Sequence, residues 1–210
     1  MSEERLLTTL AEKAAPSRAA LVVVDVQNDF VADGGFFDKI GADVRTAQAR
    51  IPALLRLIDA ARAARVPVVF VQAIYDPQYL SAPMRERNRR RGVELPRCLS
   101  GSWGAELYRV KPLAHEPVIV KHRYSAVPNT AFIPTLERLG VKSLLLAGVA
   151  TDTCVESTAR AAYFIDYYVT LVADCCAAFD ETDHLGALKR FERDYGSVVN
   201  SAQVIEAWRT

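Results

Sequence analysis

The sequence repeats one pattern along almost its whole length: a short, continuously apolar run followed by a segment with helical periodicity. The apolar runs are rich in Val, Ile and Leu and lie at residues 20–26, 66–75, 117–121, 143–149 and 167–174, with a weaker one at 197–205. Helical patterns lie at residues 44–64, 129–140, 154–166 and 182–196. Strands that are apolar on both faces are typical of parallel sheets covered on both sides. We therefore expect an α/β fold, a three-layer α/β/α sandwich around a central, mainly parallel, six-stranded sheet.

The length of the chain favours one domain over two. Its 210 residues, half of them hydrophobic, suffice for a single α/β domain with a sizeable core, which we place over residues 1–210. Residues 1–17 are expected to form an N-terminal helical extension, with an amphipathic helix over residues 3–13. Residues 76–115, called the excursion below, carry Pro, Gly and a run of arginines. Long loops in compact domains are usually functional or disordered, so we expect the excursion to cover the active-site face.

Composition argues against several classes of partner. The 26 basic and 25 acidic residues give a net charge of +1, without the positive excess typical of nucleic-acid binding. No apolar run reaches the ~18 residues that a membrane span needs, and the N-terminus lacks the apolar core of a secretory signal. The four cysteines lack C-x-x-C spacing, and a chain of this size does not need a disulfide framework. We expect a cytoplasmic protein that binds neither nucleic acid nor membrane.

A cysteine stands where the fourth apolar run passes into a helical pattern, in the stretch LAGVATDTCVESTARAA. Cys154 is expected in the first helical turn, where the helix dipole lowers a thiol pKa. Backbone N–H groups in that turn lack helical partners and can stabilise a negatively charged oxygen. The alternative is a small buried hydrophobe, which is the commoner role of a free cysteine.

Two charged residues end apolar runs in the same way. Asp25 ends LVVVD and Lys121 ends VIVK. The carboxyl ends of parallel strands meet at one edge of a sheet, so both side chains are expected near Cys154. Asp25 would then accept the thiol proton and pass it to a leaving nitrogen, while Lys121 would hold Asp25 in place. The alternatives are a turn carboxylate and a lysine whose ammonium reaches solvent from a strand end.

Histidine fits this arrangement poorly as the base. The chain has three, His115, His122 and His184. His122 adjoins Lys121 and therefore points to the opposite face of an extended strand. The reaction predicted for the group is acyl transfer to sulfur followed by hydrolysis of the thioester.

With these residues in place, the chain resembles the isochorismatase-like cysteine hydrolases from about residue 18 to residue 205. The matching stretches are LVVVDVQNDF, VIVKHRYSAVPNTAF and LLLAGVATDTCVESTARAAYFIDYYVTLVADCCAA. The resemblance implies a three-layer α/β/α fold and a catalytic triad of Asp25, Lys121 and Cys154. It also implies a cis peptide between Val149 and Ala150, with Ala150 and Cys154 as the donors of an oxyanion hole.

The resemblance also indicates a branch of the family. A cysteine at the nucleophile position favours hydrolysis of amide-type C–N bonds over the vinyl-ether cleavage of isochorismatases. Nicotinamidases carry metal-binding histidines after the second strand, whereas this chain reads QAIYDPQYLSAP, so no metal or other cofactor is expected. The stretches GSWGAEL, KHRYSAVPNT and ATDTCVEST are most similar to amidases acting on ureidoacrylate, N-carbamoylsarcosine and biuret.

We therefore expect a small amide or ureide substrate and a homodimer or homotetramer. A vinyl-ether hydrolase and a catalytically silent scaffold remain as alternatives.

Several neighbours of the triad are candidates for substrate binding, although ordinary packing or loop capping would explain each as well. They are Gln27, Phe30, Trp103, Tyr124, Asn129 and Thr151. An anionic substrate could meet one of the arginines at positions 85, 87, 89, 90 and 91, although a solvated face or a subunit contact would explain most of these. Cys175 and Cys176 are expected to be packing residues.

Overall fold

The computed structural model describes residues 5–93 and 95–209 and contains one six-stranded sheet. All five neighbouring strand pairs run parallel. The order is β3-β2-β1-β4-β5-β6, and the strands are β1 (Ala19–Val24), β2 (Val68–Ala73), β3 (Val118–Lys121), β4 (Ser143–Val149), β5 (Tyr168–Ala177) and β6 (Ser197–Val199). The chain moves outward in one direction from β1 and in the other from β4. The carboxyl ends of β1 and β4 therefore form a topological switch point, the usual place for a ligand in such a sheet.

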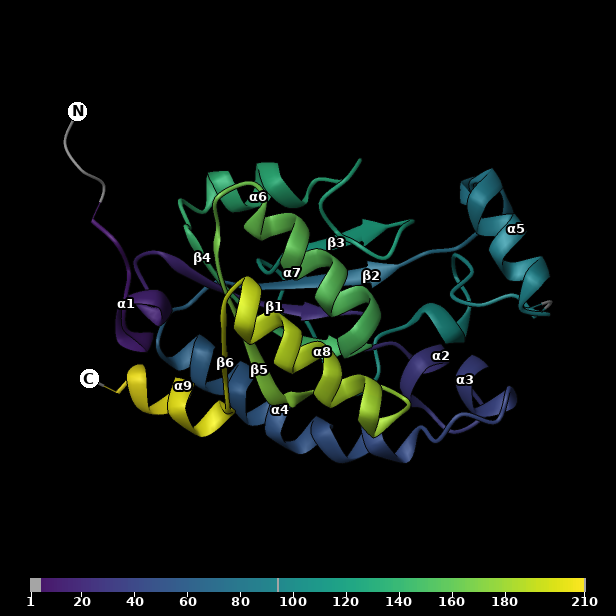
Figure 1. The fold of residues 1–210 in the computed structure, drawn as a ribbon, viewed down its shortest axis with the longest axis horizontal. Helices are drawn as coiled ribbons and strands as arrows, with labels where there is room; N and C mark the ends of the chain where they lie inside the picture. The colour runs from purple at the N-terminus through teal and green to yellow at the C-terminus, as the bar shows by residue number, and fades with distance from the viewer. Residues whose placement is uncertain (1–4, 94, 210) are drawn as a thin grey trace.

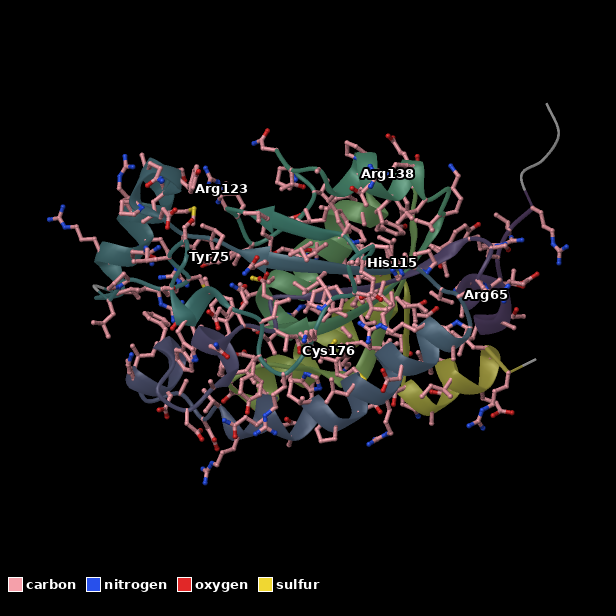
Figure 2. The ribbon with its side chains drawn as sticks, turned by 180° about the vertical axis from the view of Figure 1, so that it is seen from behind. Arg65, Tyr75, His115, Arg123, Arg138 and Cys176 are labelled. Atoms are coloured by element: carbon pink, nitrogen blue, oxygen red, sulfur yellow. The ribbon has the colours of Figure 1, made fainter. Side chains whose placement is uncertain are left out.

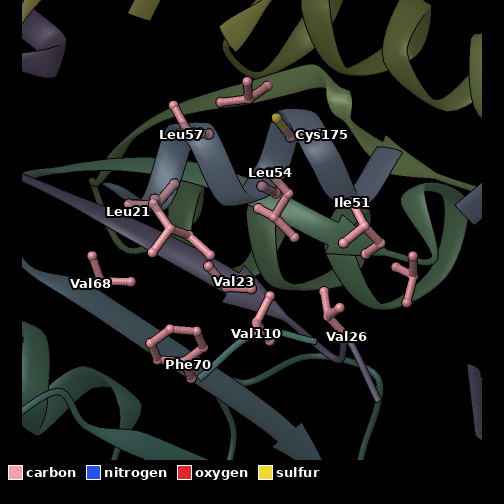
Figure 3. Packing of buried hydrophobic residues seen from close by; sticks show 14 of the residues in the cluster. Leu21, Val23, Val26, Ile51, Leu54, Leu57, Val68, Phe70, Val110 and Cys175 are labelled. Carbon is pink, nitrogen blue, oxygen red and sulfur yellow. The ribbon is translucent and has the colours of Figure 1, made fainter. Parts of the chain in front are cut away.

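Helices cover both faces of this sheet, which confirms the predicted three-layer α/β/α fold (Figure 1). One layer holds α1 (Leu10–Ala14), α4 (Arg45–Ala63) and α9 (Ser201–Ala207). The other holds α6 (Phe132–Arg138), α7 (Glu156–Tyr163) and α8 (Glu181–Asp194). Alternating side chains of the buried strands enter the two cores, and Figure 3 shows Leu54 and Leu57 of α4 packed toward Leu21 and Val23 of β1. No helix within the described ranges is long and apolar enough to cross a membrane.

The first part of the excursion, up to residue 107, lies beyond the carboxyl ends of the strands, together with two short helices, α2 (Asn28–Val31) and α3 (Phe36–Lys39) (Figure 1). Its last part returns along the sheet, with Val110 in the core beside α4 and the Lys111 carbonyl accepting a hydrogen bond from Arg62. The excursion contains helix α5 (Ala82–Arg90) and two short 3-10 turns, Pro77–Tyr79 and Trp103–Ala105. An isolated antiparallel bridge between Gln27 and Leu107 joins it to the segment that follows β1. This end of the molecule is therefore built from segments that are distant in sequence.

Two predicted elements are shorter than the sequence indicated. The expected strand over residues 197–205 ends at Val199, because Asn200 and Gln203 form a capping box that begins α9. The N-terminal helix begins at Leu10, because Thr9 and Glu12 form a second capping box there. Residues 1–4, which include the start of the predicted helix over 3–13, lie outside the described residues.

The prediction that the sheet is covered on both sides is wrong for β3. Val118 and Val120 are 41% and 44% exposed, whereas Ile119 between them is buried. β3 is an edge strand, and only the face carrying Ile119 packs against the helix layer of α6 and α7. A run of consecutive apolar residues therefore does not reveal that one face of an edge strand such as β3 is exposed to solvent.

Gly148 allows β1 and β4 to approach closely just before the switch point. Its φ is +123°, and a Cβ there would lie 2.0 Å from the carbonyl oxygen of Val24. Any side chain would push β4 away from the strand that leads into Asp25.

We expect Gly148→Ala to destabilise the fold much more than Gly140→Ala. Gly140 also has a positive φ, +68°, but no heavy atom lies within 4 Å of its added Cβ, so only backbone strain of about 1–2 kcal/mol is expected there. Gly148→Ala adds a clash between two strands, and its loss in the free energy of unfolding should be clearly larger. Urea denaturation followed by circular dichroism measures both, and equal losses would contradict this account.

Candidate active site

The structure brings Asp25, Lys121 and Cys154 together at the switch point. The Lys121 Nζ lies 2.6 Å from Asp25 Oδ2 and 3.5 Å from Cys154 Sγ. It also donates a hydrogen bond of 2.9 Å to the carbonyl of Arg123. All three side chains are buried, and the Asp25 and Lys121 side chains are fully so. The expectation that three strand ends would place these side chains in one cluster is met.

Backbone contacts fix Asp25 where β1 ends. Asp25 has a φ of +52°, an uncommon value for a residue with a side chain, and its N–H donates to the Val71 carbonyl of β2 at 2.9 Å. The next turn is held by Gln27, whose side-chain amide donates to the carbonyls of Ala73 and Ala105 and accepts from the Ala73 N–H. These bonds hold the end of β1 against β2 and the excursion.

Cys154 lies in a widened helical turn, Thr151–Val155, directly before α7. The N–H groups of Thr153 and Val155 both donate to the Ala150 carbonyl at 3.1 Å. Within the described residues, the Ala150 N–H has no backbone partner, and the Cys154 N–H has none outside its own helical turn. The peptide between Val149 and Ala150 is cis. A free donor, the Ala150 N–H, therefore lies four residues before Cys154, and the Cys154 N–H stands in the first turn of the helix that follows, the arrangement that an oxyanion hole requires.

Burial sets the protonation of the cluster. It raises the pKa of the Cys154 thiol to about 12; the Lys121 charge lowers this pKa and the Asp25 charge raises it further. Burial also raises the pKa of Asp25, against the effect of Lys121. For Lys121, burial lowers the pKa, but the charges of Asp25 and Cys154 hold it above its usual value. The expectation of an acidic thiol at a helix start is therefore not met, because the sulfur is removed from water.

A cavity of about 700 Å³ opens over Cys154. Aromatic rings form much of its wall, contributed by Phe30, Phe36, Phe37, Tyr75, Tyr124 and Phe179. The charged residues in the wall divide by element. The arginines Arg87, Arg91 and Arg97 come from the excursion, whereas Asp152, Asp180 and Asp183 come from the turn after β4 and the start of α8.

Two of the predicted substrate-binding residues, Phe30 and Tyr124, line this cavity. Gln27 does not, because its buried amide is used in the three backbone contacts described above. Thr151 is also buried away from the cavity, and its hydroxyl is 2.8 Å from Nδ1 of His184. For Gln27 and Thr151 the structure replaces the predicted substrate contact by a structural one.

Trp103 and Asn129 do not line the cavity either. The Trp103 side chain is 51% exposed, and its carbonyl accepts a hydrogen bond from Asn28. Asn129 is exposed in the loop before α6, where its φ of +57° suits a turn. The remaining cysteines lie in the packed interior at Cys98, Cys175 and Cys176, and burial raises the pKa of each. This confirms the packing role predicted for Cys175 and Cys176.

Sequence reasoning missed Tyr75 and Arg97. Tyr75, labelled in Figure 2, follows β2 and ends an apolar run, so the rule that singled out Asp25 and Lys121 would have found it. No comparable sequence pattern predicts that Arg97 lines the cavity, because its position depends on how the excursion folds. No group of three or more His, Cys, Asp or Glu in the part of the chain that the structure describes is placed to hold a metal ion. The absence of a metal from the reaction stays a prediction from the sequence.

We expect Lys121→Met to destabilise the protein more than the double variant Asp25→Asn/Lys121→Met. Removing one partner of a buried ion pair leaves a charge without compensation and typically costs about 3–5 kcal/mol. Without Lys121, the pKa of Asp25 in the folded state rises further above its unfolded value. The stability of the single variant should therefore fall as pH rises above about 4. Urea denaturation at pH 4.5 and pH 7 measures this, and a double variant as unstable as the sum of both single variants would contradict it.

Comparisons with known proteins show the family to which this chain belongs. The family described as Isochorismatase domain matches residues 19–203. A ureidoacrylate amidohydrolase RutB from Pantoea ananatis is 33% identical over 221 residues, covering 98% of this chain and 88% of that protein. The N-carbamoylsarcosine amidase of Thermoplasma acidophilum is 28% identical with a TM-score of 0.70, covering 88% of this chain and 96% of that one.

A cysteine hydrolase from Pseudomonas syringae pv. phaseolicola shares the fold, with a TM-score of 0.83 at 23% identity over 100% of this chain and 99% of that one. The family match spans nearly the whole sheet, and the relatives are similar along almost their full length. The chain belongs to the isochorismatase-like cysteine hydrolase family, as its motifs predict, and groups with the amidases of that family.

Proposed function

We propose that this protein hydrolyses a non-peptide C–N bond of a small amide, ureide or carbamoyl compound, with Cys154 as the nucleophile. The observation that carries the proposal is the cluster in which Lys121 Nζ lies 2.6 Å from Asp25 and 3.5 Å from Cys154, beneath a cavity. A nucleophile, a base and a cation are thus within reach of one substrate carbonyl. The similarity to a ureidoacrylate amidohydrolase over 98% of the chain supports the ureide class.

In the first half of the reaction, the Cys154 sulfur bonds to the substrate carbonyl carbon while Asp25 accepts the thiol proton. Because the pKa of the free thiol is about 12, this proton leaves during the attack rather than before it. The carbonyl electron pair moves to oxygen, and the N–H groups of Ala150 and Cys154 donate to that oxygen. Lys121 keeps its proton and offsets the negative charge that passes between Asp25 and the substrate.

In the second half, the proton on Asp25 passes to the leaving nitrogen as the C–N bond breaks. Ammonia or an amine departs and leaves a thioester on Cys154, or a thiocarbamate where the substrate is a ureide. Water then attacks this carbon and gives a proton to Asp25, the C–S bond breaks, and Asp25 returns the proton to sulfur. The products are a carboxylic or carbamic acid and the thiol enzyme, so no external oxidant or reductant is needed.

The two alternatives make different predictions about turnover. The vinyl-ether cleavage that isochorismatases catalyse would break a C–O bond without release of ammonia and would not need a cysteine at position 154. A silent scaffold would turn over neither substrate class. The homodimer or homotetramer implied by the sequence resemblance stays a prediction.

We expect Cys154→Ala to abolish ammonia release from every member of a panel of small amides and ureides, because no other side chain supplies a nucleophile in the cluster. Cys175→Ala is the matched control, since Cys175 is buried in the other core and lies outside the cavity. It should retain turnover. Circular dichroism should show both variants folded. Residual amide hydrolysis by folded Cys154→Ala would refute the proposed nucleophile.

The pH dependence of the hydrolytic activity should reveal the ionisation of the Asp25 carboxylate. Asp25 acts as a base only when ionised, and burial raises its pKa above the ordinary value. Activity should therefore be lost as pH falls through that raised pKa, with kcat/KM declining at a pH above about 4. Folded Asp25→Asn should lose turnover throughout the range. A wild-type profile that stays flat down to pH 4 would argue against Asp25 as the base.

A further inference from the structure

His184 is a buried ionisable residue that the mechanism above does not use. It lies in the first turns of α8, is 4% exposed, and does not line the cavity. Its Nδ1 is 2.8 Å from the hydroxyl oxygen of Thr151, which is fully buried. The two residues are 33 positions apart in the sequence, so this hydrogen bond joins α8 to the turn that carries Cys154.

Backbone hydrogen bonds give the nucleophile turn, residues 151–155, its shape. The Ala150 carbonyl accepts from the N–H groups of Thr153 and Val155. The Thr151 carbonyl accepts from the N–H of Glu156. These bonds lie within the turn and its flanking residues, so they do not set its place over the ends of the strands. That place depends on contacts that leave the turn.

Two threonine hydroxyls connect the nucleophile turn to other segments. At its start, Thr151 is bonded to His184 of α8. Beyond its end, the Thr158 hydroxyl donates to the Cys154 carbonyl at 2.8 Å and accepts from the Ala126 N–H at 3.1 Å. The turn is thus tied to its surroundings at both ends, and its start adjoins the proposed oxyanion hole.

The protonation of His184 fits this hydrogen bond. Burial lowers its pKa, the charges of Glu181 on its own helix and Asp152 in the nucleophile turn raise it, and Arg50 of α4 lowers it. The resulting pKa is below the usual value, so the ring is neutral near pH 7 and one ring nitrogen lacks a proton. With the proton on Nε2, Nδ1 accepts from the Thr151 hydroxyl, which leaves neither of these buried atoms unpaired.

We propose that His184 is a positioning residue of this active site. Through Thr151 it holds the start of the nucleophile turn, so that the Ala150 N–H and the Cys154 sulfur face the same substrate carbonyl. His184 touches no reacting atom, because it lies outside the wall of the cavity. The inference rests on the proposed function and names a residue on which the rate of that reaction depends.

The kinetic test removes either partner of the hydrogen bond and measures ammonia release from the amide or ureide that the wild type hydrolyses fastest. Thr151→Val replaces the hydroxyl by a methyl group of similar size, and His184→Leu replaces the ring by an apolar side chain. Small displacements of a nucleophile or an oxyanion donor reduce turnover steeply, so each variant should lower kcat by about 10- to 100-fold while KM changes by less than about threefold. His184→Asn places an amide oxygen near the position of Nδ1 and should restore most of the rate.

A double variant separates positioning from a merely structural role. Each single variant leaves a buried polar group without its partner, whereas Thr151→Val/His184→Leu removes both groups and should regain stability in urea denaturation. Its kcat should stay as low as that of the single variants, because the connection between α8 and the turn is still absent.

Ser201→Ala is the matched control. Ser201 is also buried, and its hydroxyl donates to Asp174 at 2.6 Å, but it lies at the start of α9 and should keep the wild-type kcat when replaced. The proposal is overturned if the double variant regains kcat together with stability, or if folded single variants turn over at the wild-type rate. It is also overturned if His184→Asn is as slow as His184→Leu, or Ser201→Ala as slow as Thr151→Val.

A second measurement separates this inference from the proposed function. Hydrogen–deuterium exchange of residues 150–155, followed by mass spectrometry, does not depend on turnover. Exchange should be faster in Thr151→Val and His184→Leu than in the wild type and in Ser201→Ala, and unchanged exchange would refute the connection. If the wild type hydrolyses no amide or ureide, the proposed function fails, and the exchange measurement still decides whether His184 holds the turn.

Discussion

The structure of this active site depends on one buried ion pair, between Lys121 and Asp25. Both side chains are fully buried, so their mutual attraction must offset the loss of hydration on both charges. The two residues stand at the ends of β3 and β1, with β2 between them. The register pairs Lys121 with Ala73 at the end of β2. The ion pair therefore requires the three strands to end at one level, and that level is where Cys154 enters from β4.

The same burial that makes the ion pair costly determines how the thiol can react. A cysteine at an exposed helix start would be acidic, but here burial outweighs the effect of the Lys121 ammonium, and the pKa of Cys154 rises to about 12. A neutral thiol is a weaker nucleophile than a thiolate and is oxidised less readily. In the proposed mechanism it becomes a nucleophile when an electrophilic carbon is bound and backbone N–H groups take up the negative charge. That mechanism couples deprotonation of the thiol to substrate binding.

Much of this could be predicted from the sequence, because the strand pattern and the parallel order place every strand end on one edge. Asp25, Lys121 and Cys154 follow from that geometry without knowledge of any loop. Gln27 and Thr151 were assigned to the substrate because sequence proximity to the triad does not show where an amide or a hydroxyl finds its partner. The partners, the Ala105 carbonyl and His184, lie 78 and 33 residues away. The short extent of β6 and the open face of β3 were missed for a related reason, since capping and edge position depend on local and tertiary contacts that a run of apolar residues does not reveal.

Arg97 marks the limit of sequence reasoning and explains how the site divides its tasks. Its place depends on the contacts of Cys98 with Asp29 and Tyr75, which join the excursion to α2 and to the end of β2. The sheet and the ion pair fix the reacting groups, whereas all the arginines of the cavity come from the excursion. A change in the excursion can therefore reshape the wall of the cavity without disturbing the triad.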